Sequence, residues 1–425
     1  MAPAARDIAV ATGVSRTAPF RPARWIECPD CGQLQGLPAP LAGHRRRCRR
    51  CGCSFGQGII RGDAALALAV TAIVLFLLAN VFPLMAINII GRGQSIELES
   101  GARGLADHQM VPLALFVLLI SAIAPFGRIV ALGYVLTHLR GTGRTSHLVP
   151  MLRFAERMRP WAMLDVFLIG ALIALTKLHD LAAIDIGVGF WSLGLLVIAL
   201  ASFDMVIDRR MLWDLVSPPC DEDRAPVRGQ CIGCRECGLV QPMAVRCIRC
   251  REPMHRRKTN SRHRAAALVL TGLVLYVPAN VYPVFTIISF GHGAPATILD
   301  GVMELMNGSD WPLAVIVFTA SIAVPLLKLV GLGFLLLSIQ LKSRSRLVDR
   351  TRLYRLIELV SRWSTVDVFV AALLTALVTL GNIATIEPGM GVLAFGAVVF
   401  VTMLATECFD PRLMWDVAGA NDVSS

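Results

Sequence analysis

Charged residues are scarce in this sequence. Asp, Glu, Lys and Arg make up 17% of the 425 residues, whereas hydrophobic residues make up 55% and the mean hydropathy is +0.62. A soluble protein of ordinary composition carries about 25% charged residues. The apolar residues come in runs of about 20 or more, long enough to cross roughly 30 Å of hydrocarbon as helices. The composition therefore predicts a polytopic membrane protein.

Signals for secretion, nucleotide binding and hydrolysis are absent. Residues 1–27 contain no apolar core, and the first long apolar run begins near Ala64, so the N-terminus is expected to stay in the cytoplasm. The sequence has no GxxxxGK[ST], HExxH or GxSxG motif, and no pair of histidines within a span suited to haem. The chain is therefore not expected to be an enzyme.

The chain contains one unit twice. The segment VPLLKLVGLG (324–333) repeats APFGRIVALG (124–133) two hundred residues later, with Lys328 in the place of Arg128. Matching motifs at nearly constant spacing indicate a duplicated module. The other pairs are ANVFP and ANVYP (79–83, 279–283), WAMLDVF and WSTVDVF (161–167, 363–369), and LWD and MWD (212–214, 414–416).

The loops predict how the chain crosses the membrane. Segments 140–160 and 341–362 and both cysteine segments are rich in Lys and Arg, whereas 180–187, 290–311 and 383–389 contain none. By the positive-inside rule, both termini are cytoplasmic and the net charge of +11 reflects topology rather than nucleic-acid binding. The predicted spans are 64–88, 110–138, 161–179, 188–207, 265–289, 312–340, 363–382 and 390–407.

The predicted fold is therefore an all-α polytopic membrane protein with two parallel four-helix transmembrane repeats. Because each repeat has an even number of spans, both enter the membrane the same way round, related by a pseudo-two-fold axis along the membrane normal. The predicted parts are a disordered basic leader (1–27), zinc ribbon 1 (28–63), module 1 (64–216), zinc ribbon 2 (217–262), module 2 (263–417) and a tail (418–425).

Two groups of cysteines predict two structural zinc sites. Paired CxxC motifs supply four thiolates for a tetrahedral shell, and segments this short need a metal in order to fold. Disulfides are disfavoured in a reducing cytoplasm, and a redox CxxC pair would not need a second pair nearby. Cys231 could replace Cys237, and Cys53 is surplus. The predicted ligands are Cys28, Cys31, Cys48 and Cys51 in ribbon 1, and Cys234, Cys237, Cys247 and Cys250 in ribbon 2.

A basic and an acidic residue recur inside the spans of each module. A charge at the centre of a span costs about 2.5–3.5 kcal/mol on insertion scales, so such residues tend to be functional. We expect Lys328 and Asp367, on successive spans of module 2, to lie at compatible depths, and Arg128 and Asp165 to form a structural ion pair in module 1. Snorkelling toward the interface is the alternative.

Hydroxyl groups accompany the charges of module 2. Ser321 lies two helical turns before Lys328 and shares its face, so with Ser364, Thr402 and Asp367 the lysine is predicted to form a polar network lining a substrate pocket. Such hydroxyls can also serve simply to hold helices together. Only the lysine can lose its proton in an apolar site, because Arg128 stays charged under ordinary conditions.

Two CxxC ribbons, each followed by four spans with AN-V-[FY]-P, a basic residue before ALG or GLG, and W-x-x-x-D-V-F, resemble the paraquat-inducible protein A family. The resemblance covers Cys28 to Asp416. The second ribbon departs from the pattern, because only nine residues separate its CxxC pairs and Cys231 is extra.

The resemblance implies a multi-pass protein of the inner membrane of Gram-negative bacteria. It implies transfer of phospholipid or a related lipid between this membrane and a periplasmic tunnel protein built of mammalian-cell-entry (MCE) domains. Two other functions remain open from the sequence: an anchor for the MCE protein that carries no lipid, and a thiol-based redox membrane protein.

Overall fold

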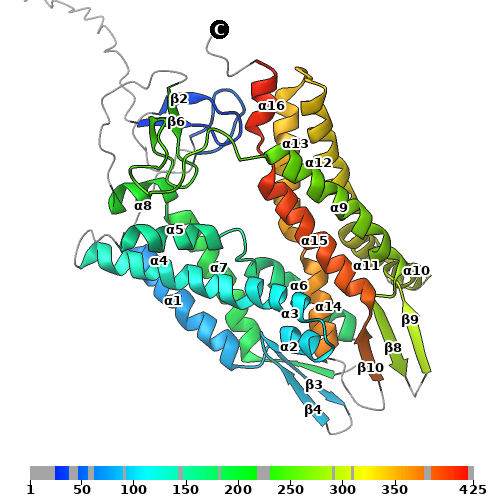
Figure 1. The fold of residues 1–425 in the computed structure, drawn as a ribbon. Helices are drawn as coiled ribbons and strands as arrows, with labels where there is room; N and C mark the ends of the chain where they lie inside the picture. Colours follow the sequence, from blue (N-terminus) through cyan, green and yellow to red (C-terminus); the bar gives the residue numbers. More distant parts are fainter. Residues whose placement is uncertain are drawn as a thin grey trace, which may run out of the picture.

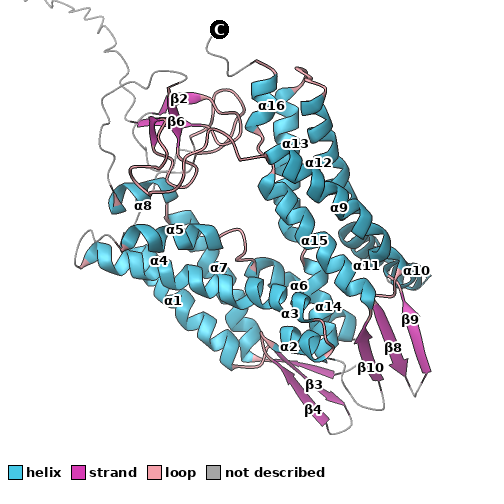
Figure 2. Cartoon of the chain, viewed as in Figure 1, coloured by secondary structure: helices cyan, strands magenta, loops and turns pink. Residues whose placement is uncertain are grey.

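The computed structural model describes most of the chain: residues 24–37, 46–55, 62–89, 92–141, 147–179, 183–217, 230–289, 292–307, 311–377 and 384–419. Long helices dominate, with strands gathered at two opposite ends (Figure 2). One end holds both cysteine segments and is called the ribbon end. The other holds two three-stranded sheets and is called the sheet end (Figure 1). Most of the predicted leader and tail, 1–23 and 420–425, lies outside the described residues.

Module 1 combines long apolar helices with a sheet. One helical path runs from Val111 to Arg140 and consists of α3, a π-helical turn η1 and α4. Strands β4, β3 and β5 form an antiparallel sheet in that order. The elements are α1 (Gly62–Val81), β3 (Met85–Ile89), β4 (Arg92–Ile96), α2 (Ser100–Asp107), α3 (Val111–Leu118), η1 (Leu119–Ile123), α4 (Ala124–Arg140), α5 (Leu148–Met158), α6 (Leu164–His179), β5 (Ala183–Ile186), α7 (Val188–Val206) and α8 (Arg209–Val216).

Module 2 has the same order of elements. Its sheet pairs β8 with both β9 and β10, as β3 pairs with β4 and β5 in module 1. The elements are α9 (Ser261–Val281), β8 (Phe285–Ser289), β9 (His292–Ala296), α10 (Ile298–Asn307), α11 (Trp311–Phe318), η2 (Thr319–Ala323), α12 (Val324–Gln340), α13 (Leu347–Trp363), α14 (Val366–Leu377), β10 (Ala384–Pro388), α15 (Met390–Cys408) and α16 (Arg412–Val417).

Seven helices among the described residues are long and apolar enough to cross a membrane, and α6 contributes a shorter apolar stretch, Leu164–Thr176. The seven include one continuous stretch, Leu347–Ala376, that joins α13 to α14. The protein is thus a multi-pass membrane protein with a mostly helical fold.

The prediction of an all-α fold was wrong at the sheet end. The first span of module 1 was expected to reach residue 88, but α1 ends at Val81 and β3 begins at Met85. Pro83 explains the difference, because a proline lacks the N–H that would continue the helix. The β-branched residues after it favour a strand. Module 2 repeats the break, since α9 ends at Val281 before Pro283 and β8 follows.

The two modules meet along α14. This helix belongs to module 2 by sequence, yet it packs against α2 and α6 of module 1 (Figure 1). A Cβ placed on Gly101 of α2 would lie 3.3 Å from Ala372, so the helices approach closely through small residues. Phe167 of α6 and Phe369 of α14 meet edge to face, with ring centroids 5.1 Å apart. The interface at which α14 of module 2 packs between α2 and α6 of module 1 is called the seam.

Each ribbon packs on the module that it does not precede. Ribbon 1 contains the hairpin of β1 (Arg24–Glu27) and β2 (Leu34–Leu37), and it shares a hydrophobic core with α12, α13 and α16 of module 2. Ribbon 2 contains the hairpin of β6 (Cys231–Gly233) and β7 (Val240–Pro242), and it shares a core with α4, α5 and α8 of module 1. The leader prediction is corrected here, because its last four residues form β1.

Candidate metal centres and polar clusters

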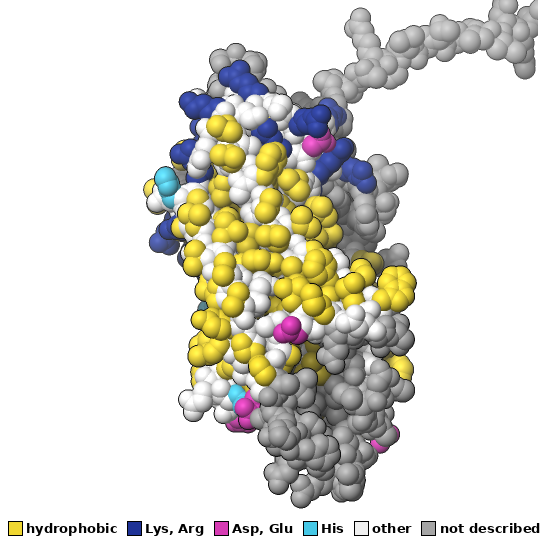
Figure 3. Space-filling view, turned by 90° about the vertical axis from the view of Figure 1, so that its right-hand side faces the viewer, with side chains coloured by type: hydrophobic (Ala, Val, Ile, Leu, Met, Phe, Trp, Pro, Cys, Tyr) yellow, Lys and Arg dark blue, Asp and Glu magenta, His cyan; other side chains and the backbone are white. Residues whose placement is uncertain are grey.

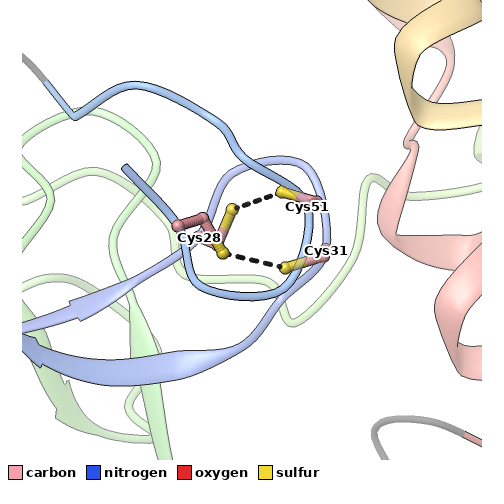
Figure 4. A group of neighbouring side chains, drawn as sticks. Cys28, Cys31 and Cys51 are labelled. Atoms are coloured by element: carbon pink, nitrogen blue, oxygen red, sulfur yellow. Dashed lines mark hydrogen bonds between the residues drawn. The ribbon is translucent and has the colours of Figure 1, made fainter. Parts of the chain in front are cut away.

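Four buried thiols converge in each ribbon. In ribbon 1, whose thiols Cys28, Cys31 and Cys51 are labelled in Figure 4, the sulfur atoms of Cys28 and Cys51 are 3.5 Å apart. Those of Cys31 and Cys48 are 3.6 Å apart. In ribbon 2, the corresponding separations are 3.4 Å for Cys234 and Cys250, and 3.6 Å for Cys237 and Cys247. All four sulfur atoms of each group lie within 4.8 Å of one another.

The thiol groups fit a tetrahedral metal ion. Metal–sulfur bonds of about 2.3 Å place neighbouring sulfur atoms about 3.8 Å apart, close to the observed separations. Hydrogen bonding among the thiols, with Cys28 as the leading partner, lowers the pKa of Cys48 and raises the pKa of Cys31 and of Cys51. One thiolate is thus stabilised at the expense of the others, and a divalent cation would allow all four to ionise.

The surplus cysteines lie outside both groups. Cys231 is in β6 and is partly exposed, while Cys237 is buried with the other three thiols of ribbon 2. Cys53 is also partly exposed and donates to the carbonyl of Ser54 at 3.7 Å. The structure therefore groups the eight cysteines chosen from the paired motifs.

Lys328 lies in the interior of module 2. Only 1% of this residue is exposed, and its Nζ donates to the hydroxyl of Thr402 on α15 at 3.1 Å. Ser321 in η2 and Ser364 after α13 are also buried. The structure thus joins Lys328 directly to one of the predicted hydroxyl groups.

The predicted pairing of Lys328 with Asp367 is not observed: no ion pair among the described residues joins them. The two residues lie on helices that pack against different neighbours. Asp367 lies in the first turn of α14, which packs at the seam against α2 and α6, whereas Lys328 lies on α12 and reaches α15. A shared depth along successive spans did not place the two side chains together.

The predicted pairing of Arg128 with Asp165 is also corrected. Arg128 pairs with Asp204 near the end of α7, within the same module. Asp165 instead faces Arg362 at 3.8 Å, and Arg362 comes from α13 of module 2. The reason is that α14, which follows α13, packs against α6 at the seam and so places the start of α6 beside the end of α13.

A partly open cavity of about 460 Å³ surrounds Arg128. It lies between α4, α5, α7, α8 and ribbon 1, and its walls carry both apolar and charged side chains. Glu156 pairs there with Arg209 at 2.8 Å, and burial raises the pKa of Glu156. The charged residues that line it are Arg128, Arg159, Arg209, Arg210, Glu156, Asp204 and Asp208.

Sequence reasoning missed several hydroxyl groups of module 2. Ser361 and Thr406 share a hydrogen bond at 3.2 Å, and Thr406 donates to the carbonyl of Thr402 at 2.9 Å. The hydroxyl of Tyr276 donates to the carbonyl of Ile322, at 3.2 Å, in the π-helical turn beside Ser321. Comparison of the repeats could have found them, because module 1 has Arg159, Asp204 and Phe76 at the positions of Ser361, Thr406 and Tyr276.

Comparison with known protein families finds the same model in both modules. The family model "Paraquat-inducible protein A" matches twice, at residues 63–217 and 263–418. The chain is 32% identical over 408 residues to "Intermembrane transport protein PqiA" of Escherichia coli strain K12, covering 93% of this chain and 96% of that protein.

Two further relatives cover a similar length. "Lipophilic envelope-spanning tunnel protein A" of the same strain is 32% identical over 391 residues, covering 92% of this chain and 90% of that protein. "Probable intermembrane transport protein" of Haemophilus influenzae is 24% identical over 409 residues, covering 93% and 97%. No solved structure matches the chain. The family model and these relatives show that the chain belongs to the paraquat-inducible protein A family.

Proposed function

We propose that this protein is the inner-membrane component of a system that moves lipid between two membranes. The observation that carries the proposal is near full-length similarity to proteins named for intermembrane transport. The proposed cargo is phospholipid or a related lipid, and the proposed partner is a periplasmic MCE-domain tunnel protein. On this account the protein is not an enzyme, and its work is binding and transfer.

We place the lipid-binding region in module 2, around Lys328. A lysine in the interior of a membrane protein is costly, and such residues mark substrate or ion pathways. Thr402 offers it a neutral hydroxyl, and no ion pair among the described residues offsets its charge. The phosphate of a lipid headgroup would supply that opposite charge. Ser321 and Ser364 remain the other proposed members of this region.

We propose eight spans with both termini in the cytoplasm. On the face in Figure 3, a broad hydrophobic band separates Lys and Arg side chains at the ribbon end from acidic side chains at the sheet end, which supports a cytoplasmic ribbon end. An introduced cysteine tests the orientation. Gly293→Cys should react with an impermeant reagent added to the periplasm and Ser345→Cys should not, and the reverse labelling would refute the model.

Zinc is the proposed metal of both ribbons, with a structural role. Four sulfur ligands leave no open coordination position for catalysis. The thiol-based redox function is disfavoured, because the eight cysteines are buried and a redox thiol needs access to its partner. Elemental analysis should therefore give close to two zinc ions per chain, one for each cysteine group.

A variant that still accumulates tests lipid transfer against the anchor function. In cells lacking their own copy of this protein, Lys328→Ala should fail to restore intermembrane lipid transport at wild-type protein level. The MCE-domain protein should still co-purify with it. Full restoration of transport would show that Lys328 is not needed for lipid transfer and would leave the anchor function standing.

A further inference from the structure

The arginines at one repeated position link each membrane module to the opposite ribbon. Arg153 lies on α5 and Arg355 on α13, and the same spacing of 202 residues separates their neighbours Trp161 and Trp363. Arg355 donates to the carbonyl of Cys51 at 3.1 Å, and Arg153 donates to the carbonyl of Cys250 at 2.5 Å. Each arginine therefore contacts the last cysteine of a thiol group that precedes the other module.

The contact with ribbon 1 is the more extensive. Arg355 also donates to the sulfur of Cys51 at 3.2 Å. It pairs at 2.6 Å with Asp30, which lies between the first two cysteines of ribbon 1 in the sequence. Arg412 of α16 donates to the carbonyl of Pro29 at 3.0 Å and pairs with Glu27 at 2.7 Å. Two arginines of module 2 thus hold one CxxC turn of ribbon 1.

Ribbon 2 is held in a related way. Arg153 lies 3.4 Å from Glu252, just beyond the last cysteine. Arg249, between the last two cysteines, pairs with Asp214 of α8 at 2.5 Å and donates to the carbonyl of Ser217 at 2.6 Å. The ribbons also touch each other, because the Gly233 N–H donates to Glu27 at 2.5 Å. Module 1, ribbon 2, ribbon 1 and module 2 therefore form one continuous chain of contacts.

We propose that the metal in each ribbon fixes the ribbon-end helix of the opposite module, α13 for ribbon 1 and α5 for ribbon 2. A ribbon without its own large core depends on the metal for its fold. Losing the metal would release the cysteine carbonyl that Arg355 or Arg153 contacts, together with the apolar surface packed on that helix. Metal loading would therefore control how firmly the two modules are held together. This inference rests on the metal proposed above.

Amide hydrogen exchange in the full chain tests the crossed arrangement. Removing metal from ribbon 1, by Cys28→Ser with Cys31→Ser, should speed exchange in α13 by about tenfold or more while α5 stays near wild type. Cys234→Ser with Cys237→Ser should do the reverse. Faster exchange in the module that each altered ribbon precedes, or equal changes in both helices, would overturn the inference.

Each ribbon also contacts the module that it precedes. Ribbon 2 reaches module 2 through Arg235, which pairs with Asp410, and through Arg257, which pairs with Asp416 of α16 at 2.5 Å. Ribbon 1 reaches module 1 through the pair of Arg46 with Asp208, at 3.5 Å, and through Arg210 over the ring of Phe55. These partners lie at the start of α8, so exchange in α5 reports on ribbon 2. Zinc content, measured on the same samples, tests the metal assignment separately from the crossing.

Arginine variants keep the inference testable where the cysteine variants fail to accumulate. Arg355→Ala should loosen α13 and speed the loss of one zinc to a chelator by about tenfold, because it removes contacts to a ligand sulfur. Arg153→Ala is the matched control, since its side chain is similarly exposed, 29% against 30%, but contacts only the carbonyl of its cysteine. It should loosen α5 and change zinc loss less. Unchanged exchange in both variants would contradict the inference.

Discussion

Modules 1 and 2 place different chemistry at equivalent positions. In module 1, Arg128 pairs with Asp204 beside an open cavity whose walls carry seven charged residues. In module 2, the equivalent Lys328 is buried and bonds to the hydroxyl of Thr402, and Thr406 replaces the aspartate. An ion pair thus balances the arginine in the first copy, while in the second the lysine bonds to a neutral hydroxyl and pairs with no acid among the described residues.

This difference favours a structural role for Arg128 and a ligand-binding role for Lys328. An ion pair that is already complete has little to gain from a ligand. A buried cation bonded to a hydroxyl gains from an anionic group, because opposite charges attract more strongly where water is excluded. The second copy is therefore the better candidate for recognising a lipid phosphate, although both copies keep the same order of helices and strands.

Exchanging the two basic residues should have its largest effect in module 2. Lys328→Arg is expected to reduce lipid transport to the level of cells without the protein. Lys328 is 1% exposed, so the larger, planar guanidinium would have to displace buried neighbours, and it also cannot lose its proton. Transport scored against protein level measures the effect, and near wild-type transport would show that any permanent cation suffices.

The reciprocal change in module 1 should have the smallest effect. Arg128→Lys keeps the charge beside Asp204, and the cavity of about 460 Å³ accommodates the new side chain. Partly exposed ion pairs contribute about 1 kcal/mol or less, so the thermal unfolding temperature and transport should stay near wild type. Loss of transport at normal protein level would mean that both modules handle cargo.

Local patterns in the sequence were sufficient to predict several features. CxxC spacing selected the eight cysteines that the structure groups, because the ligands of each site lie on two tight turns close in sequence. The apolar runs identified the long helices, and the repeated motifs matched the double match of the family model. The ends of the first helix of each module were not predicted, because the spans were drawn through Pro83 and Pro283 to residues 88 and 289.

Contacts between distant segments were not predictable in this way. The pairing of Arg128 with Asp165 assumed that each module is a closed bundle, but the packing of α14 against α2 and α6 places Asp165 beside Arg362. The packing of each ribbon on the module that it does not precede was unpredictable for the same reason, because it also joins segments far apart in the sequence. Helical periodicity gives the face of a residue on its own helix, and only the tertiary arrangement decides which helix covers that face.

Lipid retained by the purified protein tests the central claim most directly. Native mass spectrometry of the detergent-purified protein should detect a bound phospholipid in wild type and in Arg128→Ala, and should not detect it in Lys328→Ala. Bound lipid that survives in Lys328→Ala, or that disappears only in Arg128→Ala, would contradict a lipid-binding region at Lys328.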